Sequence, residues 1–138
     1  MTPTTNKPPV LLAVENEHLI LMDLADLLMD AGYRVIAEMN GEHALAVLTA
    51  RSDIDLLFTD IYLPGPLNGS ALARIVDRRW PLIALIATSG YGQPAPGELP
   101  DAVHFLPKPY TPSALLQAVQ GALPAGAQAA ALADKSLA

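Results

Sequence analysis

Asp60 is the residue with the clearest chemical potential in this chain. It closely follows the apolar run at positions 56–58, and Pro64 and Gly65 break the chain soon after it. A short apolar run of this kind indicates a buried strand. Open α/β sheets place their binding sites at the carboxyl ends of such strands. Asp60 is therefore the first candidate for a reacting group.

Other polar residues follow apolar runs in the same way. They are Glu15 and Asn16, Thr88 and Ser89, and Lys108. The oxygens of Glu15, Asn16 and Asp60 would suit Mg²⁺, which proteins bind through one or two carboxylates, water and substrate phosphate. A carboxylate beside Mg²⁺ can attack phosphorus, and a lysine and a hydroxyl can stabilise the transferred group. These residue types therefore predict phosphoryl transfer, with Lys108 and Ser89 in the two assisting roles.

Apolar runs of strand length alternate with helical patterns along the chain. The runs cover residues 10–14, 35–37, 54–58, 82–87 and 103–106. Apolar residues at helical spacing predict helices within residues 20–31, 40–48, 68–80 and 111–123. The candidate N-caps of the later helices are Asn40, then Asn68 or Ser70, and then Thr111. Three Gly and three Pro within residues 90–100 predict that the helix before the last strand is short or irregular.

The strand runs are apolar without alternation, which indicates burial on both faces and hence a parallel sheet covered by helices. Right-handed crossovers then give an α/β fold with a doubly wound, five-stranded parallel sheet. In such a sheet the carboxyl ends of the strands share one edge. We therefore expect the carboxylates, hydroxyls and ammonium group identified above to meet there, although they come from distant parts of the chain.

Composition narrows the class of protein. The chain has 138 residues, 51% of them hydrophobic, which fits one domain. A net charge of -6 with 8 basic residues argues against nucleic-acid binding. The absence of cysteine excludes disulfides and thiolate metal sites. Neither a signal peptide nor a membrane-spanning stretch is evident, so we expect a cytoplasmic protein with no membrane contact. The predicted divisions are a disordered segment at 1–9, a domain at 10–123 and an Ala-rich tail at 124–138.

Four motifs together resemble the receiver domains of two-component response regulators. They are AVENE at 13–17, TDIYLP at 59–64, ATSGY at 87–91 and FLPKPY at 105–110. Each motif is weak alone, but their order and separations are specific, and the resemblance extends from residue 10 to about residue 123. It implies a flavodoxin-like sheet of strand order 2-1-3-4-5, as in chemotaxis receivers. The spellings resemble those of single-domain regulators and of receivers in hybrid kinases.

The resemblance also implies a role for each site residue. Asp60 would accept a phosphoryl group from a sensor histidine kinase or a histidine phosphotransfer protein. Ser89 would hydrogen-bond that group, with Thr88 as the alternative hydroxyl, and Lys108 would pair with it. The peptide bond between Lys108 and Pro109 would be cis. Phe105 occupies the position of the switch aromatic, which would signal to an unknown downstream protein. The domain would act as an acceptor in a phosphorelay rather than as a turnover enzyme.

The implied metal ligands are Glu15, Asn16, Asp60 and the carbonyl of Tyr62, around Mg²⁺. Asn16 stands where the family usually has an acid, so we expect weaker Mg²⁺ binding. Asn16 could instead be only the N-cap of the first helix. A degenerate receiver that acts as a protein-interaction module without phosphorylation is the alternative function. An aspartyl-phosphate hydrolase of the haloacid-dehalogenase kind would need a second Asp at the position of Tyr62 and is disfavoured.

Overall fold

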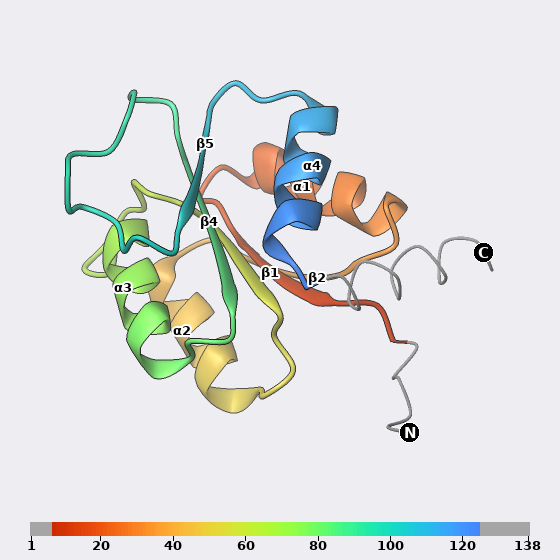
Figure 1. Cartoon of the computed structure of the whole chain (residues 1–138), viewed down its shortest axis with the longest axis horizontal. Coiled ribbons are helices and arrows are strands. Elements are labelled where there is room, and N and C mark those ends of the chain that lie inside the picture. The colour runs from red at the N-terminus through yellow and green to blue at the C-terminus, as the bar shows by residue number, and fades with distance from the viewer. Residues whose placement is uncertain (1–6, 125–138) are drawn as a thin grey trace.

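The computed structural model describes residues 7–124 as a parallel sheet with helices on both faces (Figure 1). The strand order is β2-β1-β3-β4-β5, as the resemblance implied. The strands are β1 Val10–Val14, β2 Arg34–Glu38, β3 Leu56–Asp60, β4 Ala84–Ser89 and β5 His104–Pro107. The helices in this part of the chain are α1 His18–Asp30, α2 Gly41–Ala50, α3 Gly69–Arg79 and α4 Pro112–Ala122.

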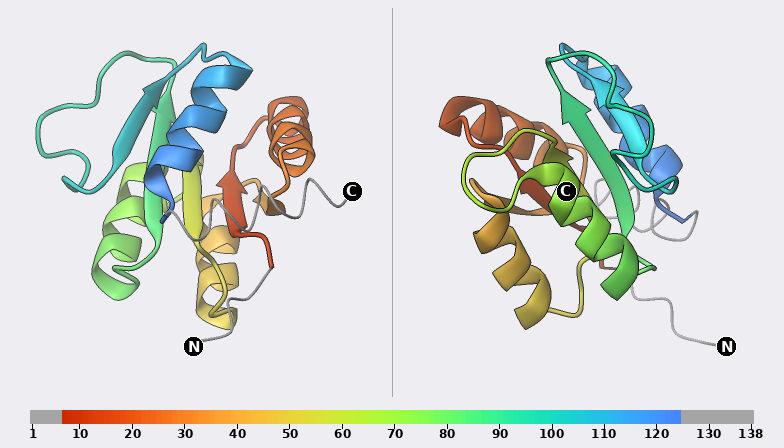
Figure 2. Two further views of the ribbon diagram at one scale, coloured as in Figure 1. Left: turned by 45° about the vertical axis from the view of Figure 1, so that its right-hand side comes forward. Right: turned by 90° about the vertical axis from the view of Figure 1, so that its left-hand side faces the viewer.

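The sheet separates two hydrophobic clusters. Helices α1 and α4 pack on one face against Leu11 and Phe58, whereas α2 and α3 pack on the other against Leu12 and Leu57 (Figure 2). Strands β1 and β3 lie at the centre and all of their residues are buried. Burial on both faces explains why these strands are continuously apolar. It also holds their carboxyl ends rigidly, which matters because the candidate site lies there.

Side-chain caps begin three helices where the sequence placed them. Asn40 accepts a hydrogen bond from the amide of His43 at 2.8 Å, and Asn68 accepts one from the amide of Ala71 at 2.9 Å. Thr111 does the same at the start of α4. Helix α1 is different, because its N-cap is Glu17 and that side chain makes no capping bond. The alternative in which Asn16 caps this helix is therefore wrong.

Strands β3 and β4 both begin and end two residues later than the apolar runs that predicted them. The ladder between them continues through Thr59 paired with Ala87 and Asp60 paired with Thr88. Backbone hydrogen bonding therefore persists where the apolar pattern stops. At the other end, Leu82 lies outside β4 with 97% of its surface exposed. As a result Asp60 and Ser89 are the last residues of their strands rather than residues of the following loops.

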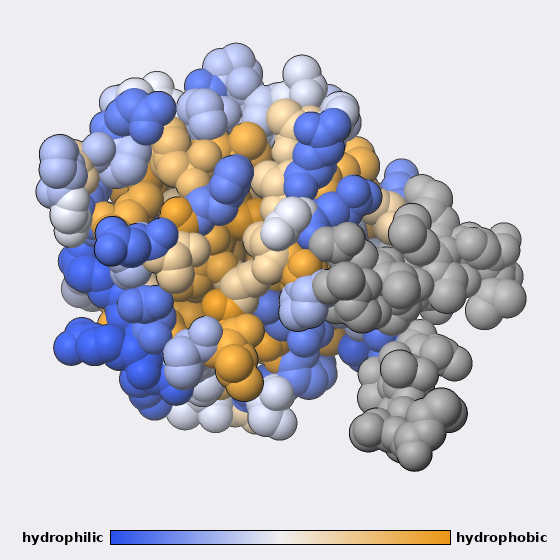
Figure 3. Space-filling model, viewed as in Figure 1, coloured by the Kyte–Doolittle hydropathy of each residue, from blue (hydrophilic) through white to orange (hydrophobic). Residues whose placement is uncertain are grey.

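An irregular segment connects β4 to β5, and the structure assigns no helix between residues 90 and 103, in agreement with the prediction for this region. The segment is tied to α3 through Glu98. The carbonyl of Glu98 accepts a hydrogen bond from Arg74 at 2.8 Å, and its side chain accepts a long one from Ser70 at 3.4 Å. Hydrophobic residues cover the middle of the molecular face that carries β4 and β5 (Figure 3).

The two predicted terminal segments lie mostly outside the described residues. Residues 1–6 and 125–138 are not described. Within the first segment, the carbonyl of Pro9 accepts a hydrogen bond from the amide of Arg34 at 3.0 Å, which aligns the chain for entry into β1. No helix formed by residues 7–124 has the length and apolar character needed to span a membrane.

Candidate functional site

The carboxyl ends of β1, β3 and β5 bring three charged side chains into contact. Glu15 follows β1, Asp60 ends β3 and Lys108 follows β5. The Nζ atom of Lys108 lies 3.0 Å from Oδ2 of Asp60 and 2.7 Å from Oε1 of Glu15. The expected meeting of a carboxylate and an ammonium group at this edge is therefore present. The structure adds that one lysine bridges both acids.

Both carboxylates are buried and each accepts a second hydrogen bond from a nearby amide. Asp60 accepts one from the amide of Tyr62 at 3.2 Å through Oδ1. Glu15 accepts one from the amide of Glu17 at 3.0 Å through Oε2. Only 8% of Asp60 and 3% of Glu15 is exposed to solvent. Each acid thus presents two hydrogen-bonded oxygens at the rim of the sheet.

The charges in this cluster depend on one another. Burial raises the pKa of Asp60 above its usual value, although the hydrogen bond and the positive charge of Lys108 pull it down. For Lys108, burial lowers the pKa, but the hydrogen bonds to Glu15 and Asp60 outweigh burial and the pKa is raised overall. Lys108 is therefore a cation at neutral pH, and it is the partner that favours the ionised, nucleophilic form of Asp60.

The backbone fixes where Lys108 emerges. Its amide donates a hydrogen bond to the carbonyl of Ser89 at 3.0 Å, which continues the pairing of β5 with β4. The peptide bond between Lys108 and Pro109 is cis, as the resemblance implied. Because the neighbouring β4 runs alongside β3, this arrangement places the lysine stem beside the end of the strand that carries Asp60.

The two candidate hydroxyls end β4 and differ in their partners. Ser89 is buried, and its Oγ accepts a hydrogen bond from the amide of Tyr91 at 3.0 Å. Thr88 is equally buried and lies in register with Asp60, and its Oγ1 has no hydrogen-bond partner among the described residues. Hydrogen bonds from either hydroxyl to Asp60 are absent from the described part of the chain. Both residues therefore stay candidates for binding a transferred group.

The remaining predicted residues lie around this cluster. Asn16 is exposed and is the second residue after β1, next to Glu15. Tyr62 is 46% exposed and follows Asp60 by two positions, so its backbone stays close to the carboxylate. Phe105 lies in β5, paired with Ala87, and is partly buried. None of these positions conflicts with the role that the resemblance implied for it.

Two tyrosines beside the site were not singled out from the sequence. Tyr91 is 83% exposed and its ring meets the ring of Tyr62 edge-on. Tyr110 packs its ring against Phe58, with centroids 6.0 Å apart, and burial raises its pKa. The only signal in the sequence was that they are the last residues of the ATSGY and FLPKPY motifs.

The oxygen atoms at this edge fit a magnesium ion. Residues 7–124 contain no group of three or more His, Cys, Asp or Glu that could hold a metal, because only Glu15 and Asp60 supply carboxylates here. Two carboxylates with water and phosphate are a sufficient set of ligands for Mg²⁺, and an exposed amide oxygen of Asn16 is a further neutral donor. The donor chemistry therefore agrees with Mg²⁺, at lower charge than three acids would provide.

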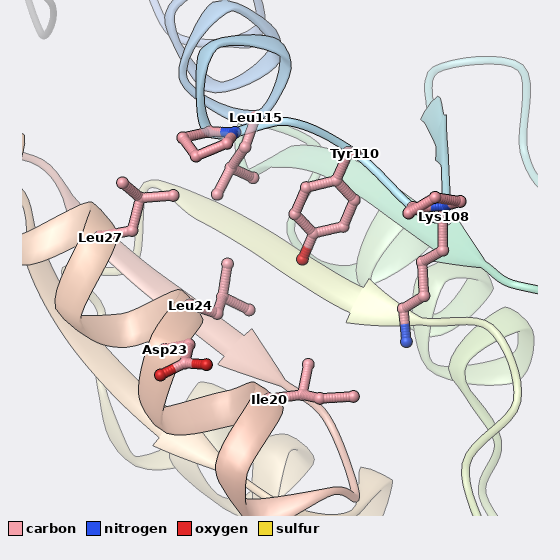
Figure 4. A pocket seen from close by; sticks show the side chains of 9 residues that line it. Ile20, Asp23, Leu24, Leu27, Lys108, Tyr110 and Leu115 are labelled. Atoms are coloured by element: carbon pink, nitrogen blue, oxygen red, sulfur yellow. The ribbon is translucent and has the colours of Figure 1, made fainter.

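A hollow of about 330 Å³ opens beside Lys108, between α1 and the start of α4 (Figure 4). Ile20 and Leu24 of α1 form one wall, and Tyr110 and Leu115 form the opposite wall. Figure 4 shows the lysine amine at the edge of this hollow rather than inside it. The candidate site therefore borders an apolar concave surface that could receive part of another molecule.

Comparisons with known proteins agree with this geometry. The family model described as "Response regulator receiver domain" matches residues 11–120. The two-component response regulator ARR21 of Arabidopsis thaliana is 32% identical over 114 residues, which make up 81% of this chain and 18% of that protein. PdtaR of Mycobacterium tuberculosis, named a transcriptional regulatory protein, is 29% identical over 123 residues, or 86% of this chain and 60% of that protein.

Solved receiver structures superpose over most of the chain. A response regulator receiver protein from Sinorhizobium medicae has a TM-score of 0.80 and 30% identity, covering 88% of this chain and 99% of its own. The receiver domain of the hybrid histidine kinase CckA has a TM-score of 0.71 and 30% identity, covering 83% and 99%. The chain spans less than two thirds of the length of both curated relatives. With the fold, the clustered Asp60 and Lys108 and the matched family model in agreement, this chain belongs to the family of response regulator receiver domains.

Proposed function

We propose that Asp60 accepts a phosphoryl group from the phosphohistidine of a sensor histidine kinase or a histidine phosphotransfer protein. The observation that carries this proposal is the contact of Lys108 with both Asp60 and Glu15 at the carboxyl edge of the sheet. In the transfer, an Asp60 oxygen forms a bond to phosphorus while the bond from phosphorus to the histidine nitrogen breaks. The imidazole leaves with the electron pair, and the product is an aspartyl phosphate.

The surrounding side chains have separate tasks in this proposal. Lys108 moves its hydrogen bond from the carboxylate to a phosphoryl oxygen, and the hydroxyl of Ser89 donates a hydrogen bond to another phosphoryl oxygen. Glu15, Asn16 and the carbonyl of Tyr62 would hold Mg²⁺ together with Asp60. When bound, Mg²⁺ supplies positive charge to the oxygens of the transferred group. Glu15 also keeps the ammonium group of Lys108 within reach of Asp60.

Intact-mass spectrometry of the protein after treatment with acetyl phosphate and Mg²⁺ tests the proposal. We expect a gain of one phosphoryl group in the wild-type protein and none in Asp60→Asn, which keeps the size of the side chain but removes its nucleophilic oxygen. Omission of Mg²⁺ should strongly reduce the gain. A protein that stays unmodified at every Mg²⁺ concentration would support the alternative, a receiver that works by protein contacts alone.

The proposed signal is a change in the packing of β4 and β5. If Ser89 turns toward a phosphoryl group, the space beside β5 changes, and Phe105 is the partly buried aromatic residue on that strand. A local event that reorients two side chains can bias a two-state surface. The unknown downstream protein would read this surface. The acidic charge of the chain argues against direct contact of this domain with nucleic acid.

The apolar surface of α1 is where we place the phosphohistidine donor. Leu19 is 77% exposed and Ile20 borders the hollow beside Lys108. We expect Ile20→Glu to slow transfer from a protein donor roughly thirtyfold, the equivalent of the about 2 kcal/mol lost at one interface hot spot. Transfer from acetyl phosphate should stay unchanged. The donor used would be the member of a panel of phosphorylated histidine phosphotransfer proteins that transfers its phosphoryl group fastest to the wild-type protein. Met29→Glu, at the far end of α1, is the matched control.

Asn16 is the residue that distinguishes the proposed metal site from a site with three acids. We expect Asn16→Asp to tighten Mg²⁺ binding roughly tenfold, because a charged ligand replaces a neutral one near Glu15 and Asp60. Calorimetric titration with MgCl₂ measures this directly. Asn16→Ala serves as the control and should weaken binding slightly. Equal affinities in all three proteins would remove Asn16 from the set of ligands.

A further inference from the structure

Two exposed aromatic rings meet beside the proposed acceptor. The ring centroids of Tyr62 and Tyr91 lie 5.3 Å apart with the rings nearly perpendicular, at 89°. This is the favourable edge-to-face arrangement of aromatic pairs. Tyr62 belongs to the segment after β3 and Tyr91 to the segment after β4, so the contact joins two separate loops. Because both rings are exposed, their contact contributes little to the hydrophobic core, and its effect is on the two loops that it joins.

The backbone amides of the same two residues hold the two side chains that the proposed reaction uses. The amide of Tyr62 donates to Oδ1 of Asp60 at 3.2 Å, and the amide of Tyr91 donates to Oγ of Ser89 at 3.0 Å. A chain of contacts therefore runs from the carboxylate, through one tyrosine and its ring to the other, and back to the hydroxyl. The two exposed rings thus connect the loop that holds Asp60 to the loop that holds Ser89 at the protein surface.

We infer that the Tyr62–Tyr91 ring contact is a positioning element that sets the hydroxyl of Ser89 relative to Asp60. This inference rests on the proposed function. A serine hydroxyl has one proton and two acceptor sites. The bond from the Tyr91 amide uses one acceptor site and orients the oxygen, which leaves the proton available for a phosphoryl oxygen on Asp60. Tyr62 and Tyr91 act through other groups and touch no reacting atom with their rings.

Loss of either ring should therefore slow the formation of aspartyl phosphate by leaving Ser89 less well oriented. We expect Tyr62→Ala and Tyr91→Ala each to lower the rate with acetyl phosphate at saturating Mg²⁺ by roughly fivefold to tenfold, the rate equivalent of one aromatic pair. The double variant should be no slower than the single ones, because both remove the same contact. Tyr91→Phe keeps the ring and should restore the wild-type rate.

The background Ser89→Ala separates positioning from other roles of the rings. If the rings act through the hydroxyl, Tyr91→Ala should make no further difference to the rate when Ser89 is already alanine. Rings that instead shielded the site from water or bound the donor would keep their effect in that background. Hydrogen exchange provides a second measurement, because the amide of Tyr91 should lose protection in Tyr62→Ala. Thermal unfolding checks that the variants remain folded, as expected for side chains this exposed.

Each outcome supports or overturns the inference. Coupled losses that vanish in Ser89→Ala support it. Additive losses, losses that persist in Ser89→Ala, or rates equal to wild type in all ring variants overturn it while leaving Asp60 as the acceptor. A wild-type protein that takes no phosphoryl group overturns both this inference and the proposed function, so the two failures are distinguishable.

Discussion

Lys108→Met is expected to destabilise the folded protein by about 3–5 kcal/mol at pH 7, the range for removing one partner from a buried ion pair. The methionine keeps most of the apolar stem of the lysine but removes its ammonium group. Glu15 and Asp60, both bonded to that group in the wild-type protein, are then left as two buried like charges. Urea denaturation at pH 7 measures the loss as a shift in the midpoint.

The size of this loss should depend on pH in a defined direction. Burial already raises the pKa of Asp60, and Lys108 opposes that rise, so the variant has a still higher Asp60 pKa. When folding raises the pKa of a carboxyl group, the folded state binds more protons than the unfolded state. The free energy of unfolding therefore falls as the pH rises from the unfolded pKa, roughly 4, through the folded pKa. This downward slope is steeper in the variant. The difference between the two proteins therefore grows from pH 4 to pH 7.

Lys7→Met makes the same change in net charge at an exposed position and should alter stability by less than about 0.5 kcal/mol. A Lys108→Met variant with the same deficit at pH 4.5 and pH 7 would contradict the electrostatic explanation. In that case the methionine itself would be packed poorly. For the wild-type protein, the raised pKa of Lys108 means that its contribution persists at neutral pH and is lost only above the ordinary lysine pKa.

Parallel topology explains why the sequence was enough to predict that Glu15, Asp60 and Lys108 meet. Each of these residues follows or ends a strand. Parallel strands bring their carboxyl ends to one edge of the sheet, and this placement does not depend on the conformation of the loops. The caps at Asn40 and Asn68 were equally predictable from the sequence. A capping side chain accepts a hydrogen bond from the amide only three residues later, so the interaction is local. Strand order came from the resemblance, since apolar runs alone do not specify neighbours.

Features that depend on tertiary contacts could not be predicted from the sequence. Asn16 looked like a helix cap, but the carboxylate of Glu15 takes the amide of Glu17, and the helix begins one residue later than that expectation required. Strand ends were misplaced because the ladder continues beyond the apolar residues. The ring contact of Tyr62 with Tyr91 joins two loops, and the bridging of both acids by Lys108 depends on the route of its side chain. Neither has a local pattern.

Gly69→Ala is expected to destabilise the protein by about 3 kcal/mol, at the upper end of the range for overpacking. Gly69 is the first residue of α3, and its amide donates to the carbonyl of Ile61 at 2.8 Å. A β-carbon at this position would overlap the carbonyl oxygen of Asp60 and come within 2.9 Å of the Cα of Ile61. Both neighbours are backbone, so relief requires α3 or the end of β3 to move.

This movement would also displace the proposed acceptor, because the overlapping oxygen belongs to Asp60 itself. We therefore expect the variant to lose phosphorylation by acetyl phosphate as well as stability, with urea denaturation and intact mass as the two measurements. Gly121→Ala is the matched control: it lies in α4, nothing lies within 4 Å of an added β-carbon, and helix propensity favours alanine by up to about 1 kcal/mol. Equal effects of the two substitutions would contradict the proposed clash, since only Gly69 has backbone where its side chain would be. A stable Gly69→Ala variant with normal phosphorylation would show that α3 can shift without moving Asp60.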